Sequence, residues 1–463
     1  MIKSSLLIAL LLSSPLIADM SFEEWQNQEN RAFKNYQTQM DKEFIEMLKR
    51  DWQEYQSMQT PTSYQRPKPQ YQPILQLEPK PQKLVKIPSN PPKLIAIPKP
   101  PKKEYIKGYK QIRFKFFSLN INLHYDKRLK PNIGAISNSA IADFWNKSSS
   151  INYKLLIKEI KEYQDIYGLD GWSSYLLVNK LSKEIVNHDI NSQNLLTWFI
   201  LVKLGVDTKV GFSSNQISLL IHSDEMLYGV NFFTIDGKKY YRFNNNGTKK
   251  LKIYKGEINT LYAMKFLNQK VKIPFNIKYR KIRFNYQSRE YQLNIPYNTT
   301  LVQLYKTYPQ LDYNRYVELS KLSQDFIEQE LKPIVSSMSK IEAINFLLRL
   351  TQNGFRYKTD TENFGKEKVM FFEETIHYAY SDCEDRAIFF ATLVKQLLKV
   401  DIVFVKYPNH LATAIRLKSK IGDDKIIYQN QRYYIADPTY SNANIGQAMP
   451  QIKGQKIKII KLF

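Results

Sequence analysis

Two parts of this 463-residue chain repeat the same series of features in the same order. The segment 112-IRFKFFSLNINLHYD-126 has a counterpart in 282-IRFNYQSREYQLNIPYN-298, and each is typical of two short strands around a turn. Further on, 195-LLTWFILVKLGVDTKVGFSSNQ-216 aligns with 389-FFATLVKQLLKVDIVFVKYPNH-410, where an apolar helix precedes a strand. Finally, 240-YYRFN-244 matches 433-YYIAD-437. We therefore predict a tandem duplication, with one copy over 105–265 and the other over 266–463.

The start of the chain has the pattern of a secretory signal. The stretch 1-MIKSSLLIALLLSSPLIADM-20 places one lysine before a short apolar run and a small residue, Ala18, at a plausible cleavage edge. The run is too short to span a bilayer comfortably, although an uncleaved anchor is the alternative. We therefore predict a signal peptide over 1–18 and export to the periplasm or cell envelope.

An amphipathic helix is predicted over 19–58. Ser21 and Glu24 form a capping-box pattern, and aromatic and apolar residues then recur every three or four positions as far as Tyr55. The resulting apolar stripe over 21–57 docks on the main body, self-associates, or binds a partner or a membrane surface. The sequence does not choose between these outcomes.

A proline- and lysine-rich linker is predicted over 59–104. It holds twelve of the 21 prolines, which favour an extended, stiff chain. The simplest role is a spacer that separates the exported body from its anchor. The net charge of the whole chain is +25, and residues 61–110 carry eleven Lys and Arg against Glu78 and Glu104. After export, an anionic envelope polymer or membrane contact through this basic linker is a more natural partner than nucleic acid.

The second copy carries three chemistry-bearing residues at equal spacing: Cys383, His410 and Asp437. Cys383, the single cysteine of the chain, opens an apolar helix, His410 begins a strand, and Asp437 ends one just before Pro438. Nucleophilic catalysis by cysteine requires a thiolate, a histidine that takes the proton, and a third residue that orients the imidazole. These three residue types therefore predict a thiol site.

Acidic residues surround the cysteine and oppose a thiolate there. Asp382, Glu384 and Asp385 flank Cys383, whereas the start of a helix and a charged imidazole both favour negative sulfur. We expect Asp382 to cap the helix and Asp385 or Glu384 to pair with Arg386 or with first-turn amides. Tyr380 is a further supporting candidate, although an aromatic residue before a helix is more often a packing residue.

The string Asp-Cys-Glu-Asp-Arg at 382–386, followed by His410 and by 436-ADPTY-440, resembles the bacterial transglutaminase-like superfamily of papain-like folds. The approach 355-FRYKTDTENFGKEKVMFFEETIHYAYSDCED-385 is also similar to the family's approach to its cysteine, and the resemblance extends over roughly residues 340–445. It implies an α+β fold built from tandem papain-like domains. It also implies acyl transfer, in which Cys383 attacks a carboxamide, His410 acts as base and then acid, and Asp437 orients His410.

The resemblance implies a cysteine peptidase or amidase that acts on proteins or peptides of the cell envelope. Amine transfer of the transglutaminase type is the alternative reaction, and a non-catalytic envelope scaffold with a buried, inert cysteine is the alternative class. No cofactor is expected, although Asp382, Glu384 and Asp385 together offer oxygen ligands that would suit Ca²⁺.

The first copy lacks the thiol site. Alignment of the copies places Asp189, or nearby Ser192, opposite Cys383, Gln216 opposite His410 and Asn244 opposite Asp437. None of these residues can perform the same chemistry, so we expect a degenerate domain that serves packing, substrate binding or regulation. Of the remaining histidines, His377 is a rival base because it is close to Cys383 in sequence, and His124 lies on an expected strand without partners.

Overall fold

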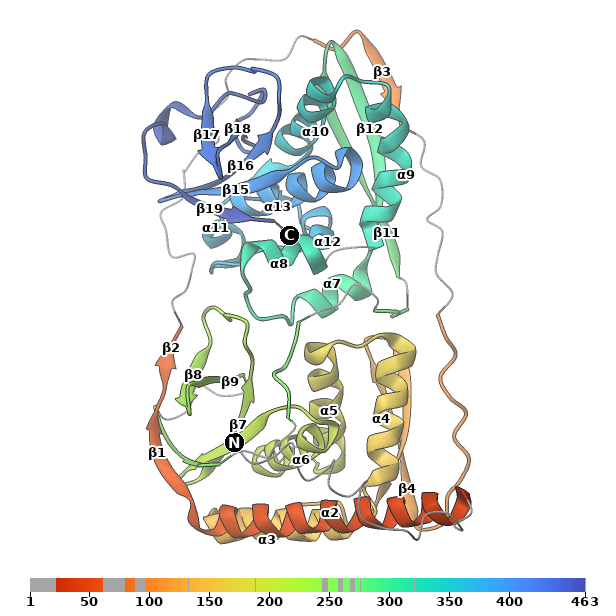
Figure 1. Cartoon of the computed structure of the whole chain (residues 1–463). Coiled ribbons are helices and arrows are strands. Elements are labelled where there is room, and N and C mark those ends of the chain that lie inside the picture. The colour runs from red at the N-terminus through yellow and green to blue at the C-terminus, as the bar shows by residue number, and fades with distance from the viewer. Residues whose placement is uncertain are drawn as a thin grey trace.

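The computed structural model describes residues 22–60, 80–87, 97–131, 133–187, 189–243, 249–256, 261–266, 271–274, 276–319 and 322–462. The predicted signal peptide over 1–18 lies outside these residues. Figure 1 shows two bodies stacked along one axis, each with helices packed on an antiparallel sheet. The expected α+β class is therefore confirmed.

The first half contains the elements that follow the long helix α2 (Phe22–Arg50). Its helices are α3 (Asn138–Ser150), α4 (Lys154–Tyr167), α5 (Gly171–Ile185) and α6 (Ile190–Leu204). Its strands are β1 (Trp52–Gln56), β2 (Met58–Gln59), β4 (Tyr109–Phe116), β5 (Leu119–Asp126), β6 (Thr208–Ser213), β7 (Gln216–His222), β8 (Asn231–Ile235), β9 (Lys238–Arg242) and β10 (Lys250–Tyr254).

The second half begins with a long hairpin and ends with a sheet. Its helices are α7 (Thr299–Tyr305), α8 (Tyr313–Leu319), α9 (Leu322–Ser336), α10 (Lys340–Gly354), α11 (Asp360–Phe364), α12 (Phe372–His377) and α13 (Cys383–Leu393), which continues as the π-turn η2 (Val394–Leu398); the 3-10 turn η3 (Pro450–Ile452) comes later. Its strands are β3 (Lys83–Lys86), β11 (Ile277–Tyr286), β12 (Arg289–Asn298), β13 (Arg356–Tyr357), β14 (Tyr380–Ser381), β15 (Ile402–Tyr407), β16 (His410–Arg416), β17 (Lys425–Tyr428), β18 (Gln431–Ala436) and β19 (Lys458–Lys461).

The two halves share one strand order. The five central strands of the first sheet run β10-β6-β7-β9-β8, and those of the second run β19-β15-β16-β18-β17. Each pair of neighbours is antiparallel. When each set of five strands is numbered along the chain, both sheets have the order 5-1-2-4-3. In the first sheet, β1 and β2 extend the two edges.

The hairpin before each sheet also turns in the same way. Phe117 and Ser118 connect β4 to β5, Gln287 and Ser288 connect β11 to β12, and all four residues have positive φ. Two consecutive residues with positive φ form the turn whose twist matches that of the flanking strands. The same rare conformation therefore occupies the corresponding place in both halves, although none of the four residues is glycine.

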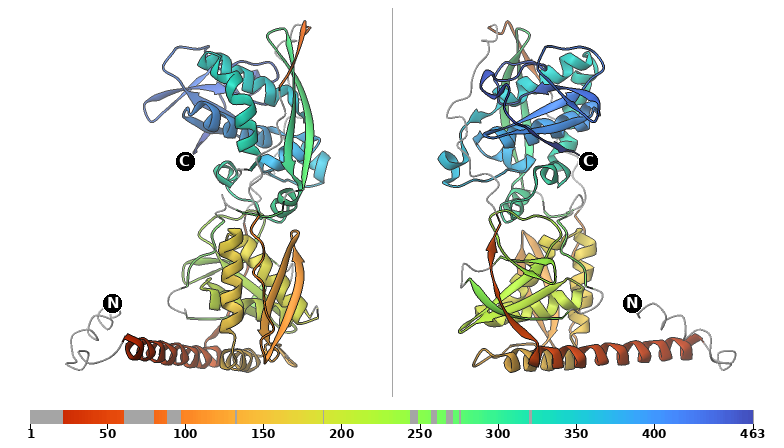
Figure 2. Two further views of the ribbon diagram at one scale, coloured as in Figure 1. Left: turned by 90° about the vertical axis from the view of Figure 1, so that its right-hand side faces the viewer. Right: turned by 60° about the vertical axis from the view of Figure 1, so that its left-hand side comes forward.

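The helix predicted over 19–58 ends earlier than expected. In the structure α2 stops at Arg50, and residues 52–56 form β1, which pairs with β10. The C-terminal part of α2 buries Phe44, Ile45 and Leu48 against the first half, whereas the rest of the helix projects to one side (Figure 2). The periodic apolar pattern continued past Arg50 because the half-buried side chains of β1 fall on similar spacings. Edge pairing with β10 decides the strand conformation.

The linker predicted over 59–104 is not a simple spacer. Residues 58–59 pair with β8 in the first half, β3 pairs in parallel with β12 at the far end of the second half, and the chain then returns to β4 in the first half (Figure 1). On its return, Pro98 accepts a hydrogen bond from Tyr167, and Lys103 forms ion pairs with Glu159 and Glu162. The described parts of the segment therefore contact both halves.

The boundary between the halves lies later than the predicted residue 266. The backbone N–H of Met264 donates to His222, and that of Lys272 donates to Tyr167, so these residues pack on the first half. The second half begins at β11. Between the halves, Arg315 forms an ion pair with Glu225, and Tyr308 donates to Asp170 at 2.7 Å.

Candidate thiol site

Cys383 is the first residue of α13, as the sequence predicted. Its helix is buried on all sides and packs against β16, so the apolar sequence that follows the cysteine is a core helix. The side chain of Asp385 accepts a hydrogen bond from the backbone N–H of Asp382 at 3.2 Å, which is one half of a capping box. The cysteine is thus held at the N-terminal end of α13, where the aligned backbone dipoles favour negative charge.

The thiol itself is bonded to an acid. Cys383 Sγ donates to Glu384 Oε2 at 2.9 Å, and only 2% of the cysteine is exposed. In this structure the sulfur is therefore covered by neighbouring side chains and makes a hydrogen bond to Glu384.

His410 and Asp437 lie together as the predicted order requires. His410 begins β16, Asp437 directly follows β18, and the two strands are neighbours in the second sheet. His410 Nε2 lies 2.8 Å from Asp437 Oδ2, and both side chains are almost completely buried. The other carboxylate oxygen accepts from the backbone N–H groups of Thr439 and Tyr440. Asp437 is therefore held by the chain that follows it.

The bond to Asp437 assigns the roles of the two imidazole nitrogens. Because a carboxylate oxygen accepts, Nε2 is the donor in this contact, and a neutral imidazole with that tautomer has its lone pair on Nδ1. Nδ1 of His410 is buried and has no hydrogen-bond partner within the part of the chain that the structure describes. The Cys383–His410 hydrogen bond of an activated thiol is accordingly not formed here.

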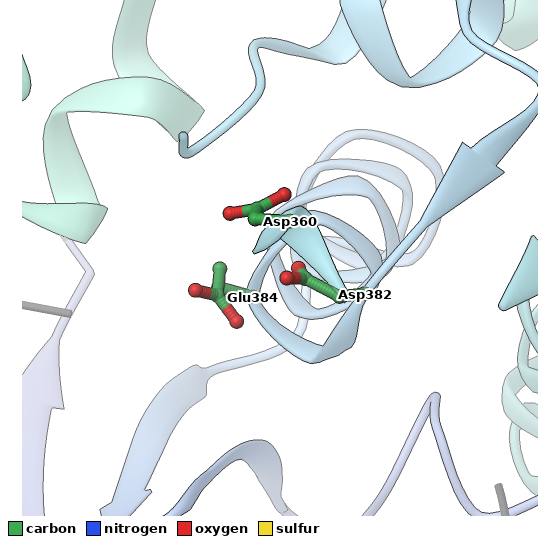
Figure 3. Close-up of side chains that lie close together, drawn as sticks. All are labelled: Asp360, Asp382 and Glu384. Atoms are coloured by element: carbon green, nitrogen blue, oxygen red, sulfur yellow. The ribbon is translucent and has the colours of Figure 1, made fainter. Parts of the chain in front are cut away.

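A cluster of three buried carboxylates adjoins the thiol. Asp360, Asp382 and Glu384 each place an oxygen within 4.8 Å of the others (Figure 3). Oxygen ligands of this kind suit Ca²⁺ or Mg²⁺. Asp360, which we had not expected, takes the place in this group that the sequence had given to Asp385.

The remaining predicted supporting residues have structural partners. Asp385 accepts from the backbone of Met370 as well as that of Asp382. Arg386, which we expected to pair with a neighbouring acid, instead donates to Ser381, Gln352 and Phe355, and burial lowers its pKa to about 10. Arg386 thus ties the end of α10 to the strand that leads into the cysteine.

Tyr380, the third supporting candidate, lies in β14 opposite Arg356. Its ring packs beneath the ammonium of Lys358, whose Nζ is 4.8 Å from the ring centre. These contacts match the packing interpretation of this tyrosine, which was the alternative to a supporting role.

The corresponding place in the first half shows how the copies differ. Asp189 is the N-cap of α6 and accepts from Ser192, so it corresponds to Asp382, and Ile190 takes the place of Cys383. The alignment from sequence, which placed Asp189 or Ser192 opposite the cysteine, was therefore in error because it did not use the helix start. Gln216 begins β7 as His410 begins β16. Asn244 lies outside the described residues.

Two other histidines have different roles. His124, which we expected to lack partners, is buried on β5 with Nδ1 3.0 Å from Glu159 Oε1. The ring of His377, the rival base, packs edge-on against Tyr297 and Tyr378. His410 is the histidine that the structure places with Asp437.

Two residues near the site gave no functional signal in the sequence. Asp360 follows Thr359 in a capping-box pattern that indicates a helix start and nothing about a neighbouring cysteine. Gln352, within α10, donates to the backbone carbonyl of Asp437 at 2.9 Å. Both come near the site only through the packing of separate elements.

No protein-family model, no curated protein and no solved structure matches this chain. Among the helices that the structure describes, none combines the length and the apolar character needed to cross a membrane.

Proposed function

We propose that the second half is a transglutaminase-like, papain-like domain that performs thiol acyl transfer, as a cysteine peptidase or amidase on peptides or proteins of the cell envelope. The first half is then a degenerate copy of the same domain, and the chain is exported to the periplasm. The observation that carries the proposal is the His410–Asp437 pair at 2.8 Å beside a helix that begins with Cys383. The equal strand order of the two halves supports the duplication.

The proposed reaction uses these three side chains in sequence. The bond between Cys383 and Glu384 breaks, and His410 Nδ1 takes the thiol proton as the sulfur attacks the carbonyl carbon of a carboxamide. The imidazolium, whose other proton is held by Asp437, then gives a proton to the departing amine. Water, deprotonated by His410, attacks the thioester and releases the acid together with the restored thiol. An amine in place of water would give the transglutaminase outcome.

The burial of the thiol favours a second candidate function. Because Cys383 is buried and bonded to Glu384, a non-catalytic envelope scaffold with an inert thiol accounts for the same contacts. The two functions differ in the expected behaviour of the sulfur toward a small electrophile.

The test is the rate at which iodoacetamide alkylates Cys383 in the full chain near neutral pH. An acyl-transfer site should react at least about tenfold faster than a free peptide thiol, since imidazole stabilises the thiolate. His410→Ala should remove that excess, whereas His222→Gln, in the other half, should not, with circular dichroism used to check the fold. A rate equal to that of a free thiol, unchanged by His410→Ala, would favour the scaffold.

Capture of the acyl group then distinguishes the reactions. Envelope peptides incubated with the protein should yield a thioester on Cys383, detected by mass spectrometry, and no such adduct on a Cys383→Ser variant. Release of the acyl group to water indicates a peptidase or amidase, and incorporation of an added primary amine indicates transfer.

A further inference from the structure

A cationic cleft lies in the second half between the long hairpin and the ends of two helices. It has a volume of about 550 Å³ and is lined by residues of β11 and β12, of the chain at the end of α10, and of the chain at the end of α12. Its basic lining residues are Arg280, Lys281, Arg356 and His377, and no acidic residue lines it.

The cations of this cleft are not neutralised by nearby acids. Within the described residues, neither Arg280, Lys281 nor Arg356 forms an ion pair with a carboxylate. Arg280 uses its guanidinium to bind the backbone carbonyls of Ile376, Tyr378 and Ala379 at the end of α12. These contacts fix the position of the guanidinium beside the cleft without an acidic partner among the described residues.

The pKa of His377 is also affected by the positive charge around the cleft. Burial lowers the pKa of His377, and the neighbouring cations Lys306, Lys278, Arg280 and Lys368 lower it further. Nδ1 of His377 is buried and has no hydrogen-bond partner in the described part of the chain. A buried polar atom without a partner costs free energy, which a ligand in the cleft could recover.

The shape of the cleft depends on close packing at its back wall. Gly354, the last residue of α10, lies so near β11 that a Cβ there would meet Ile282 Cγ2 at 2.7 Å. Aromatic side chains complete the lining, with Tyr279 half exposed at the rim and Phe355 beneath the Arg280 guanidinium. Fixed cations beside flat apolar surfaces suit a ligand that has a charged head and an apolar body.

We propose that this cleft is a binding site for an oxyanion, a carboxylate or phosphate group, held by Arg356, Lys281 and His377. Arginine presents paired donors that match both kinds of anion, and His377 supplies a further nitrogen. This site is separate from the chemistry of Cys383 and does not depend on the proposed function.

The cleft is nonetheless close to the thiol along the chain. Arg356 in β13 pairs with Tyr380 in β14, and Ala379, which lines the cleft, precedes Cys383 by four residues. Four residues span at most about 14 Å, so the Cα atoms of Ala379 and Cys383 can be no further apart than that. An anion bound beside Ala379 would therefore lie close to the segment that carries Cys383.

Isothermal titration calorimetry of the full chain at low ionic strength tests the proposal, with inorganic phosphate and N-acetyl-glutamate as the two probes. Saturable binding of either probe is expected, and the tighter probe identifies the class of anion. The Arg356→Gln, Lys281→Gln double variant should bind at least about tenfold more weakly, because it lacks two of the charged donors proposed to hold the anion. Binding of neither probe to the wild-type chain would overturn the site.

Arg283→Gln is the matched control, because it removes one positive charge from the same strand outside the lining residues. Its dissociation constant should stay within about twofold of the wild-type value. If Arg283→Gln weakens binding as much as the double variant does, the anion is attracted by the basic protein in general and not by this cleft. In a second measurement, the anion should raise the pKa of His377, followed by NMR of its ring. No change in that titration on saturation would also contradict the proposal.

Discussion

At the scale of single residues, the most informative contact is that between Cys383 and Glu384. The acid that follows the cysteine in the sequence does more than begin the helix, since Glu384 Oε2 accepts a hydrogen bond from Cys383 Sγ at 2.9 Å. Nδ1 of His410 meanwhile has no hydrogen-bond partner among the residues that the structure describes. Under the proposed function, His410 would activate the sulfur and Glu384 would restrain it, and the balance between them would decide whether the thiol reacts.

Replacement of the acid tests that balance. Glu384→Gln removes the charge that opposes a thiolate and weakens the hydrogen bond that holds the proton on sulfur. We expect alkylation of Cys383 by iodoacetamide at neutral pH to become roughly tenfold faster, since a bond to a charged group contributes about 1.5–3 kcal/mol.

Glu54→Gln serves as its control, because Glu54 is an exposed acid of the first half paired only at the surface with Lys250. The alkylation rate of this variant should equal that of the wild-type protein. If Glu384→Gln reacts no faster or more slowly, Glu384 does not restrain the thiol.

At the scale of elements, the segment between α7 and α8 joins the two halves through buried aromatic residues. Tyr308 donates to Asp170, the N-cap of α5, and its ring packs with Tyr305 and Phe371. Burial raises the pKa of both tyrosines well above the usual value, and the neighbouring acids, Glu373 near Tyr305 and Asp170 near Tyr308, raise it further. Both phenols must therefore stay protonated while the halves remain packed.

Stability should accordingly fall at alkaline pH. A folded-state pKa above that of the unfolded chain means that the stabilisation is complete below about pH 10 and is lost as the pH rises further. For each such tyrosine the free energy of unfolding should fall by about 1.4 kcal/mol per pH unit above that point. Urea denaturation followed by circular dichroism between pH 7 and pH 12 provides the measurement.

The variant Tyr308→Phe isolates the contribution of Tyr308 to the loss of stability at alkaline pH. The variant should lose about 1–3 kcal/mol at neutral pH, because Asp170 loses a buried donor, and should fall less steeply above pH 10. Tyr105→Phe, at a position that is 83% exposed, should behave as the wild-type protein does. Equal alkaline slopes for Tyr308→Phe and the wild-type protein would show that Tyr308 ionises freely.

At the scale of the whole molecule, the proline-rich segment connects distant surfaces. It leaves the first half after β2, contributes β3 to the hairpin of the second half and returns to begin β4. The parallel pairing of β3 with β12 is closed at its ends by backbone hydrogen bonds from Gln82 and Ile87. The connection therefore restrains the two halves relative to each other as well as linking them in sequence.

Loss of one buried side chain should release that contact. Ile87 is 5% exposed, and Ile87→Ala should weaken the docking of β3 by about 2 kcal/mol. Hydrogen exchange of the peptide 82–87, followed by mass spectrometry, should become roughly 30-fold faster, because local opening follows the free energy of docking. Leu84→Ala, at a 45% exposed position on the same strand, should change this rate little. Equal exchange in both variants would mean that Ile87 does not hold the segment.

The sequence by itself determined those features that depend on local pattern. Alternating apolar residues around a turn predicted the two hairpins, and an apolar run after Cys383 predicted a core helix with the cysteine at its start. The strands that carry His410 and Asp437 were predicted for the same reason, because hydrophobic periodicity is read over a few neighbouring residues.

Only the tertiary structure decided what depends on elements that meet from distant parts of the chain. The end of α2 at Arg50, the return of the linker through β3, and the approach of Asp360 to Glu384 all arise from pairing or packing across long sequence separations. Local propensity is weak compared with the burial and hydrogen bonding that such contacts supply, so the assembled fold decides them.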